Sequence, residues 1–454
     1  MNTAQRTKIK IAYVGGGSRG WAPNLMSDLA LSPFLEGEIA LYDIDQEAAK
    51  ANVSVGQAIF SHPQAKTKLS VSAVGTLTQA LDGADFVVIS IEPGPTTLRY
   101  ADLEIPKRYG ILQTVGDTTG PGGILRALRT VSIYEELARE IMLRCPKAWV
   151  INYTNPMTIC TASLYAVEPN IKAFGCCHEV FSAQEALAKL VGRWFDVEEP
   201  NRSEIVLDIA GVNHFTFATA ASWKGEALLP RMKSLIDESD YFADRTTKAL
   251  ERRLAEEWFD HDSLIASDFL RRFGALGAAG DRHLAEFVPW YLVSEDNLHR
   301  WGVVATPYEW RVRRMSEYSR RDADAPLTPS GEEGVGQIHA LLGITDLVTN
   351  VNMPNRGQMV ALPSGSVVES YARFSQNEVR PIVCSPLPSA LEGIVRRISQ
   401  VQEMTLKAAR ERNVDLAFQA VLSDPLVHIP TDQAWRMFRE MLDHVKGALP
   451  GWRL

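Results

Sequence analysis

Residues 9–20 read Ile-Lys-Ile-Ala-Tyr-Val-Gly-Gly-Gly-Ser-Arg-Gly, so an apolar run passes directly into a cluster of glycines. The run predicts a buried strand, and Pro23 suits the first turn of a helix that follows the glycines. The glycines between them form the pattern Gly-x-Gly-x-x-Gly. Such glycines allow a tight turn and let backbone N–H groups approach a pyrophosphate at the start of a helix. The stretch therefore predicts a dinucleotide-binding loop made of Gly15, Gly16, Gly17, Ser18, Arg19 and Gly20.

The second predicted strand, residues 39–43, ends in an acidic residue, Asp43. A carboxylate at this point of a dinucleotide-binding unit binds the ribose hydroxyls, which favours NAD over NADP. Arg19 could instead accommodate the 2′-phosphate of NADP, so NADP stays open. A chance glycine turn would explain the glycines alone, but it would not explain the strand, the helix and Asp43 together.

Residues 1–200 alternate between strand-like and helix-like stretches, which predicts an α/β fold with a Rossmann-type doubly wound parallel sheet. Ser182 and Glu185 form a capping-box pattern for a helix that runs to about Leu190. The other elements that we expect here are a helix from Gln46, strands at residues 69–74, 86–91, 149–152 and 171–174, and a long helix at 123–143.

From about residue 200 the regular alternation of strand-like and helix-like stretches ends. We expect a C-terminal α+β domain over residues 201–454 that contributes to a metal and substrate site. The position of the domain boundary is approximate, because candidate ligands lie on both sides of it. In this half the sequence predicts a strand at 205–210, a charged helix at 245–259, an exposed loop at 313–331 and a helical tail from Leu391.

Composition and charge exclude several classes of function. The chain has 454 residues, a net charge of -8 and five cysteines. No basic cluster dominates, so nucleic acid is not an expected partner. No apolar run approaches the ~18 residues of a membrane span, and the polar residues 1–10 do not predict a signal peptide. An odd and sparse set of cysteines favours free thiols and a cytoplasmic location.

Two metal-ligand types follow predicted strands: Cys177 after residues 171–174, and His214 after the run that begins at Ile205. Thiolate and imidazole bind transition metals. For a single cysteine, packing in the core is the ordinary explanation, and the spacing alone does not show that the two residues meet. Cys176 and His178 point to the opposite side from Cys177 if the chain is extended there.

Three further polar clusters lie at expected sheet edges: residues 116–118, 152–156 and 280–283. Each could be a simple turn; the Asn-Pro pair at 155–156 is a turn signal. The glycine-dense stretch 116–123 precedes a helix, so it could also be a mobile loop that closes over an active site.

Taken together, these segments resemble glycoside hydrolase family 4 over nearly the whole chain. The matching motifs are the glycine loop 15–20 and residues 115–123, 152–156, 175–180, 211–215, 280–283 and 350–358. Within the family, Cys177-His178 resembles the branch that acts on unphosphorylated α-glycosides, because phospho-glycosidases tend to carry Asn or Asp after this cysteine. Residues 175–181, 279–287 and 350–358 are most similar to bacterial α-galacturonidases.

The resemblance implies hydrolysis through a transient oxidation, an exception among glycosidases. NAD would accept hydride from sugar C3, a base would remove the C2 proton, the leaving group would be eliminated, and water and hydride would then return. Manganese is the family's usual metal. A thiolate is a soft ligand, however, and soft ligands favour zinc. The fold would be that of the lactate/malate dehydrogenase superfamily, and the family habit implies a homodimer or homotetramer.

The resemblance also assigns roles to residues. Cys177 and His214 would be the metal ligands, and Asp281 the general base or acid near C2. His178 would bind substrate or assist the leaving group. A uronate carboxylate needs an arginine, for which Arg282 and Arg356 are the candidates. The remaining implied site residues are Asp117 as a catalytic or substrate-shell residue, Asn155 beside cofactor and substrate, and Asn213 beside substrate.

Several alternatives stay open at this point. The sugar could be a glucuronide, a galactoside or a glucoside, because these differ from a galacturonide by one epimer or one oxidation level. A plain NAD-dependent 2-hydroxy acid dehydrogenase would need only the N-terminal domain. A nucleotide-sensing regulatory protein would need no catalytic residues, which the presence of Cys177, His214 and Asp281 disfavours.

Overall fold

The computed structural model describes residues 6–238, 240–316 and 326–454. Within them, one 13-stranded sheet has the order β10-β8-β7-β12-β11-β6-β5-β4-β1-β2-β3, with β13 beside β12 and β9 beside β8. The strands are β1 (Thr7–Val14), β2 (Leu35–Tyr42), β3 (Lys68–Ala73), β4 (Phe86–Ile89), β5 (Trp149–Asn152), β6 (Lys172–Gly175), β7 (Val206–Val212), β8 (Phe215–Trp223), β9 (Glu226–Ala227), β10 (Leu276–Gly277), β11 (Leu347–Pro354), β12 (Val367–Ser375) and β13 (Glu378–Pro381).

The N-terminal part of the sheet has the strand order 3-2-1-4-5-6, and all of its neighbouring strands are parallel. This is the order of a Rossmann fold, in which ligands bind at the carboxyl ends of β1 and β4. The predicted doubly wound sheet is therefore confirmed. All six of its strands overlap strands that the sequence predicts.

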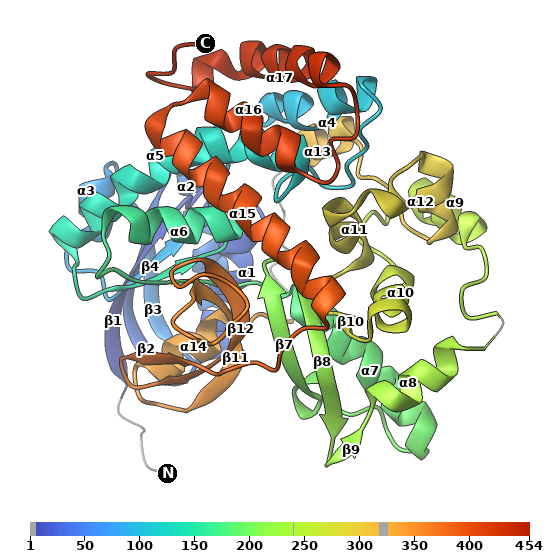
Figure 1. Cartoon of the computed structure of the whole chain (residues 1–454). Helices are drawn as coiled ribbons and strands as arrows, with labels where there is room; N and C mark the ends of the chain where they lie inside the picture. Colours follow the sequence, from blue (N-terminus) through green and yellow to red (C-terminus); the bar gives the residue numbers. More distant parts are fainter. Residues whose placement is uncertain (1–5, 239, 317–325) are drawn as a thin grey trace.

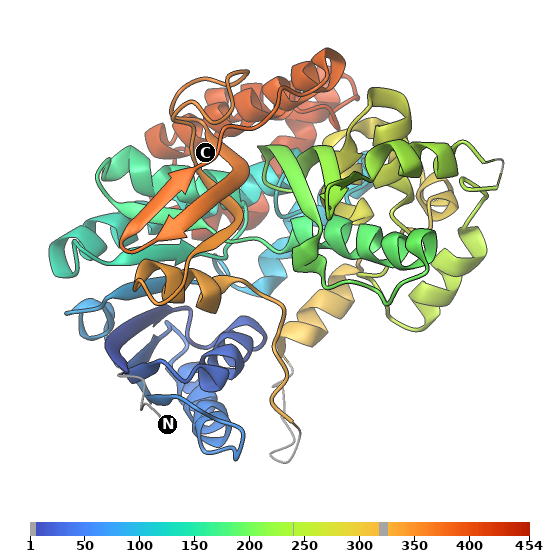
Figure 2. The ribbon, with the colours of Figure 1, turned by 90° about the horizontal axis from the view of Figure 1, so that it is seen from below.

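The second part of the sheet is antiparallel: β11 pairs with β6, β12 pairs with β11 and β7, and β8 pairs with β7 and β10. Hydrogen bonding thus continues from β6 across residue 200 into strands that come much later in the sequence. Seen from below, the hairpin of β11 and β12 and the helix α14 (Gly334–Leu341) lie between the N-terminal strands and the β7–β8 hairpin (Figure 2).

Helices cover both faces of the sheet (Figure 1). The long helix α15 (Ser389–Glu411) packs on α5, α6 and β7, so it ties the two parts of the sheet together. The other helices that position the site are α1 (Trp21–Leu31), α2 (Gln46–Phe60), α3 (Leu77–Leu81), α4 (Arg99–Arg108), α5 (Gly120–Arg144), α6 (Met157–Val167), α7 (Glu179–Phe195), α10 (Leu264–Phe273), α11 (Asp281–Leu284) and α13 (Tyr308–Ser316), with the short helix η1 (Thr96–Leu98) before α4.

The remaining helices lie around this frame. They are α8 (Leu229–Ile236), α9 (Thr246–Leu254), α12 (Glu295–Arg300), α16 (Val414–Ser423), α17 (Thr431–Val445), η2 (Arg202–Glu204), η3 (Ala285–Phe287), η4 (Pro289–Tyr291) and η5 (Lys446–Ala448). Among the described residues no helix is long and apolar enough to cross a membrane.

The alternation of β1 side chains explains the two N-terminal cores. Ile9, Ile11 and Tyr13 are buried against residues of α1, α2 and α14, whereas Ala12 and Val14 are buried against α3, α5 and α6. Successive side chains of a strand point to opposite faces, and a strand covered on both faces is therefore mostly apolar. The apolar run at residues 9–14 is therefore the part of the sequence that sets the layers.

Three expected elements are wrong in their bounds. The helix predicted from Ser182 begins at Glu179, and the Ser182 hydroxyl donates to the carbonyl of Glu179 inside the first turn, so Ser182 does not cap the helix. The helix predicted at 245–259 ends at Leu254, because Glu256 adopts a left-handed backbone (φ 58°) that a helix cannot continue. Helix α13 includes residues 313–316 of the expected loop, and residues 317–325 lie outside the described residues.

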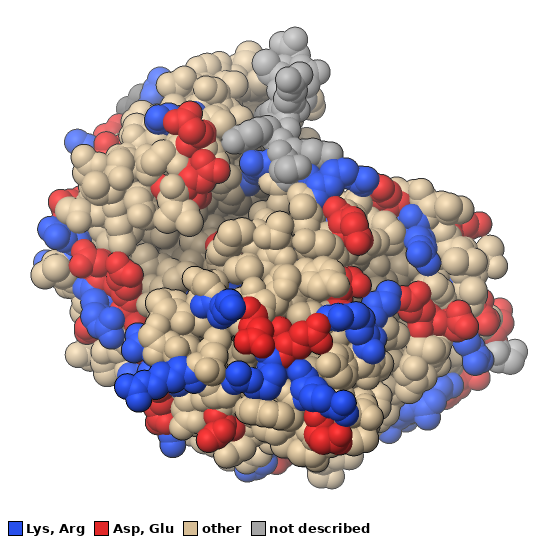
Figure 3. Space-filling view, turned by 90° about the horizontal axis from the view of Figure 1, so that it is seen from above, with Lys and Arg blue, Asp and Glu red and all other residues tan. Residues whose placement is uncertain are grey.

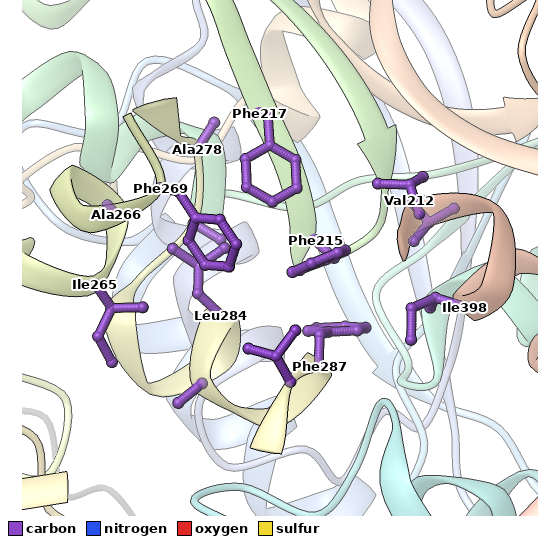
Figure 4. Close-up of a cluster of buried hydrophobic side chains, with 14 of the residues drawn as sticks. Val212, Phe215, Phe217, Ile265, Ala266, Phe269, Ala278, Leu284, Phe287 and Ile398 are labelled. Atoms are coloured by element: carbon purple, nitrogen blue, oxygen red, sulfur yellow. The ribbon is translucent and has the colours of Figure 1, made fainter. Parts of the chain in front are cut away.

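A cluster of aromatic rings supports the β7–β8 turn (Figure 4). Phe215, the residue after His214, stacks on Phe287 with ring centroids 4.7 Å apart, and it meets Phe217 edge-on at 4.8 Å. Phe217 in turn packs against Phe269 of α10. All four rings are buried, and each contributes roughly 2–3 kcal/mol by burial. The cluster fixes the position from which His214 projects.

Seen from above, the surface carries acidic and basic residues interspersed around a hollow (Figure 3). The walls of the hollow are formed mainly by uncharged residues, and charged side chains lie at its rim.

Candidate active site

The glycine loop closes the gap between β1, β2 and β4. Gly15 has φ +90°, and a Cβ there would meet the carbonyl oxygen of Ser90 at 2.0 Å. A Cβ on Gly16 would meet Leu41 at 2.7 Å. At Gly20, by contrast, a Cβ would meet nothing within 4 Å, so open space lies beside the start of α1. The first two glycines are therefore required by close packing, and Gly20 borders the space that a pyrophosphate would need.

Asp43 holds this loop from the end of β2. Its Oδ2 accepts the Gly17 N–H at 2.8 Å, and its Oδ1 accepts the N–H of Asp45 at 2.9 Å. Asn52 donates to the carbonyls of Gly16 and Ser18 at 2.7 and 2.8 Å. Glycine loop and acidic residue thus meet as the sequence predicts, and the residues fit a dinucleotide. Whether they bind NAD or NADP stays a prediction.

The loop after β5 carries Asn155, which precedes a cis peptide bond to Pro156. Its backbone carbonyl accepts the Nε–H of Arg126 at 2.9 Å. Its side-chain Oδ1 is buried and has no hydrogen-bond partner. An unsatisfied buried acceptor is costly, so this amide is free to bind a donor that a ligand brings.

Cys177 lies where the chain leaves β6, and it is 6% exposed. Asn350 donates its Nδ2–H to the Cys177 carbonyl at 2.8 Å, and the amide of Asn213 lies beside the thiol. Burial and the nearby carboxylates of Glu369 and Glu179 raise the pKa of the thiol well above its usual range. A bound cation would therefore have to displace the thiol proton.

His214 lies in the β7–β8 turn with a left-handed backbone (φ 66°) and is 3% exposed. Its Nδ1 lies 2.9 Å from the Thr118 hydroxyl, which also lies 2.8 Å from Asp117 Oδ1. Because the Asp117 carboxylate can only accept, the single hydroxyl proton goes to it, and Nδ1 must donate to the Thr118 oxygen. Nε2 then carries a free lone pair, which is the form of histidine that binds a metal.

The electrostatics support this neutral form. Burial, together with His283 at a ring-centroid distance of 3.9 Å, lowers the pKa of His214 to about 3. Burial alone would raise the pKa of Asp117, but the charges of Arg99, His283 and His214 hold it well below its usual range. At neutral pH the pair is an anionic acceptor and a neutral imidazole.

A chain of titratable side chains continues from His214. His283 Nε2 lies 3.3 Å from Glu179 Oε1, and Glu179 Oε2 accepts the Gly280 N–H at 2.8 Å. His178 lies 3.7 Å from Glu179 and 2.9 Å from Glu332. Burial would lower the pKa of His178, but these two carboxylates raise it to about 9, so His178 is cationic at neutral pH.

Among the described residues, no group of three or more His, Cys, Asp or Glu side chains is arranged to hold a metal ion. The two candidate ligands, Cys177 and His214, would therefore leave several coordination positions to water and substrate oxygens. Such an open site is typical of catalytic rather than structural metals.

Arginines gather on the other side of Asp117. Glu92 forms ion pairs with Arg126 and, at 3.3 Å, with Arg99. Burial would raise the pKa of Glu92, but the two guanidinium groups lower it to about 2. Arg311 of α13 lies close enough to Arg99 and Asp117 for their charges to interact.

Two other predicted site residues, Asp281 and Arg356, lie in surroundings that the sequence does not predict. Asp281 is fully buried, and its carboxylate accepts the N–H groups of Leu264 and Ala266 at the start of α10 at 2.8 and 2.9 Å. Arg356 is exposed beyond the end of β11, which runs antiparallel to β6, so its backbone lies toward the opposite edge of the sheet from Cys177.

Several residues that complete the site were not predicted. Glu179 and His283 lie inside recognised motifs, and the charge of Glu179, two residues after the predicted ligand Cys177, was an available signal. Thr118 also lies inside a recognised motif, but a hydroxyl in a loop is ordinary, and Glu92 lies outside the motifs. Arg311 lies in an element that the sequence predicts as a loop from residue 313 onward, so only the fold reveals its position.

Comparison with known proteins identifies relatives over the whole chain. The profile described as "Family 4 glycosyl hydrolase" matches residues 10–193, and that of its C-terminal domain matches residues 209–427. Four curated α-galacturonidases are 39–45% identical; that of Thermoanaerobacterium saccharolyticum is 45% identical over 98% of this chain and 97% of its own. An α-galactosidase from Bacillus subtilis is 28% identical.

Solved structures of similar fold include proteins described as glucosidases. A Bacillus subtilis protein described as a glucosidase superposes with a TM-score of 0.87 at 42% identity, over 96% of this chain and 100% of its own. A 6-phospho-α-glucosidase from gut microorganisms, in complex with NAD and Mn2+, has a TM-score of 0.78 at 21% identity over 98% and 100% of the two chains, and therefore shows the shared fold alone.

Proposed function

Because the chain belongs to glycoside hydrolase family 4, we propose that it hydrolyses α-linked galacturonides with NAD and a divalent metal, manganese in the first instance. The observation that carries the proposal is whole-length identity of 39–45% to relatives named α-galacturonidase, against 28% to an α-galactosidase. The cationic side chains around Asp117 support an anionic substrate.

Residues of this chain are available to bind both cofactors. The loop 15–20 and Asp43 would hold the dinucleotide, and Cys177 Sγ with His214 Nε2 would hold the metal. When bound, NAD would supply a hydride acceptor for sugar C3, and the metal would supply positive charge that strengthens the acidifying effect of the resulting C3 carbonyl on the C2 proton.

The protein side chains would then position the substrate and move protons. Asp117 and Thr118 keep His214 in the tautomer that leaves Nε2 free. Asp281 is our candidate for taking the C2 proton, and burial raises its pKa above the usual value of a carboxyl group. His178, which is cationic at neutral pH, can donate to the leaving oxygen. Asn155 and Asn213 would donate to and accept from sugar hydroxyls.

The substrate class is tested by a panel of four α-linked nitrophenyl glycosides: galacturonide, glucuronide, galactoside and glucoside. With NAD and manganese present, we expect kcat/KM for the galacturonide to exceed that of the galactoside at least about 100-fold, because a charge-assisted pair to a buried arginine contributes a few kcal/mol. Preference for a neutral hexoside would contradict the proposed substrate and leave the family assignment untouched.

The proposal also includes a cellular location and an oligomeric state. All five cysteines are free thiols, which suits a reducing cytoplasm. A homodimer or homotetramer follows the family habit, and a mass measurement in solution would decide between them.

A further inference from the structure

Helix α13 places one arginine against the active-site loop. Its first residue, Tyr308, packs edge-on against Tyr100 of α4, with ring centroids 5.6 Å apart. Just before the helix, the Thr306 N–H donates to the carbonyl of Thr114, in the loop that carries Asp117. Arg311 is therefore held on the side of α13 that faces α4 and this loop, close to Asp117 and Arg282.

Two of the three guanidinium nitrogens of Arg311 have no acceptor among the described residues. Its Nε and Nη2 atoms are buried and make no hydrogen bond. Nη1 of Arg99 is buried and unsatisfied in the same way, while its Nη2 pairs with Glu92. An unpaired buried guanidinium is strongly unfavourable, so a structural arginine would normally have recruited a carboxylate or a carbonyl.

Each neighbouring acid accepts hydrogen bonds from other groups on one of its oxygens, while Oε2 of Glu286 is buried without a partner. Asp117 accepts the Thr118 hydroxyl, and Glu286 Oε1 accepts the N–H groups of Val115 and Gly116 at 2.7 and 2.9 Å. Burial lowers the pKa of Arg311 to about 9, and the charges of Arg99 and Arg282 add to this effect. Among the described residues Asp117 and Glu286 therefore lie close enough to interact with the Arg311 charge, but no carboxylate forms a hydrogen bond or an ion pair with it.

We infer that Arg311, together with the free Nη1 of Arg99, binds the carboxylate at C5 of the uronide substrate. This assignment rests on the proposed function and replaces the two arginines that the motifs suggested. A planar carboxylate offers two acceptor oxygens to donors of this geometry and charge.

The two earlier candidates are less suited to the role. The Arg282 guanidinium lies over the Phe259 ring at 4.2 Å, and its Nη1 donates to the carbonyl of Trp258 at 3.4 Å. It therefore already has an aromatic and a polar partner. Arg356 is exposed and remote from Cys177 along the sheet. Among these arginines, Arg311 has the unsatisfied donors.

The test compares Arg311→Gln with wild type. We expect kcat/KM for nitrophenyl α-galacturonide to fall about 50-fold, because at least one charge-assisted hydrogen bond is lost. The inhibition constant of free galacturonate should rise by a similar factor, and that of free galactose should change less than about threefold. Melting of the ligand-free variant should occur at the same temperature or higher, since an unpaired buried charge has been removed.

The matched control is Arg313→Gln on the same helix, whose guanidinium pairs with exposed Glu256. It should leave both inhibition constants unchanged. Equal loss of galacturonate and galactose binding in Arg311→Gln, or no loss of either, would overturn the inference. Stronger inhibition by galactose 6-phosphate than by galacturonate in wild type would assign the arginine to a phosphate instead. If wild type cleaves no galacturonide, the proposed function fails, whatever the variants do.

Discussion

Cys177→Ser is expected to lower kcat/KM at limiting manganese by at least about 1000-fold and to leave NAD affinity unchanged. A serine hydroxyl does not ionise near neutral pH, so it cannot replace a thiolate in a site to which the protein contributes two ligands. The dinucleotide loop, in contrast, is built from β1, β2 and α1 and does not depend on this side chain. Metal content after gel filtration and quenching of protein fluorescence by NAD measure the two effects separately.

Cys176→Ala provides the matched control, because Cys176 is the adjacent residue in sequence. Its side chain is buried among apolar residues of the core that includes Tyr153 and Ile338. Its loss should cost about 1–2 kcal/mol of unfolding free energy and leave metal content intact. Wild-type turnover of Cys177→Ser at limiting manganese would show that Cys177 is not a ligand.

Asp117→Asn is expected to lower metal-dependent activity by about 100- to 1000-fold. An asparagine amide can donate to the Thr118 hydroxyl, which then donates to His214 Nδ1 and places the imidazole proton on Nε2. The same reversal behind a catalytic histidine in serine proteases is severely damaging, because the wrong tautomer is held in place. The measured quantities are kcat/KM and the manganese dissociation constant.

Thr118→Val separates the tautomer effect from a general disturbance of the loop. Valine preserves the shape of the side chain and removes the hydroxyl, so neither tautomer is favoured, and we expect only about a 10- to 100-fold loss of metal affinity. A loss in Thr118→Val that equals or exceeds the loss in Asp117→Asn would argue against the hydroxyl relay.

The sequence predicts the N-terminal fold well because a parallel strand covered on both faces leaves an apolar run. The strand at residues 149–152 is found as predicted, and the glycine loop meets Asp43. Helix ends are less predictable, since they depend on single residues such as Glu256 with its left-handed backbone. The antiparallel half of the sheet could not be foreseen, because β11 follows β6 by about 170 residues of intervening chain.

For the site, residue chemistry predicts candidates but not their partners. Cys177 and His214 stand out as metal-ligand types, whereas the orientation of His214 depends on Thr118, an ordinary loop residue. Asp281 stands out as a charge in a motif, yet its carboxylate caps α10 through two backbone N–H groups. The role of Arg311 depends on which acceptors are missing around it, which only the folded chain can show.

The central claim is hydrolysis through an oxidation that is reversed within each turnover. The direct measurement follows nitrophenol at 400 nm, roughly its absorption maximum, and NADH together while wild-type protein acts on nitrophenyl α-galacturonide with NAD and manganese. We predict many equivalents of nitrophenol per enzyme, no net NADH, and no product when either cofactor is withheld. NADH accumulating in proportion to substrate consumed, without nitrophenol, would contradict the account and indicate a simple dehydrogenase.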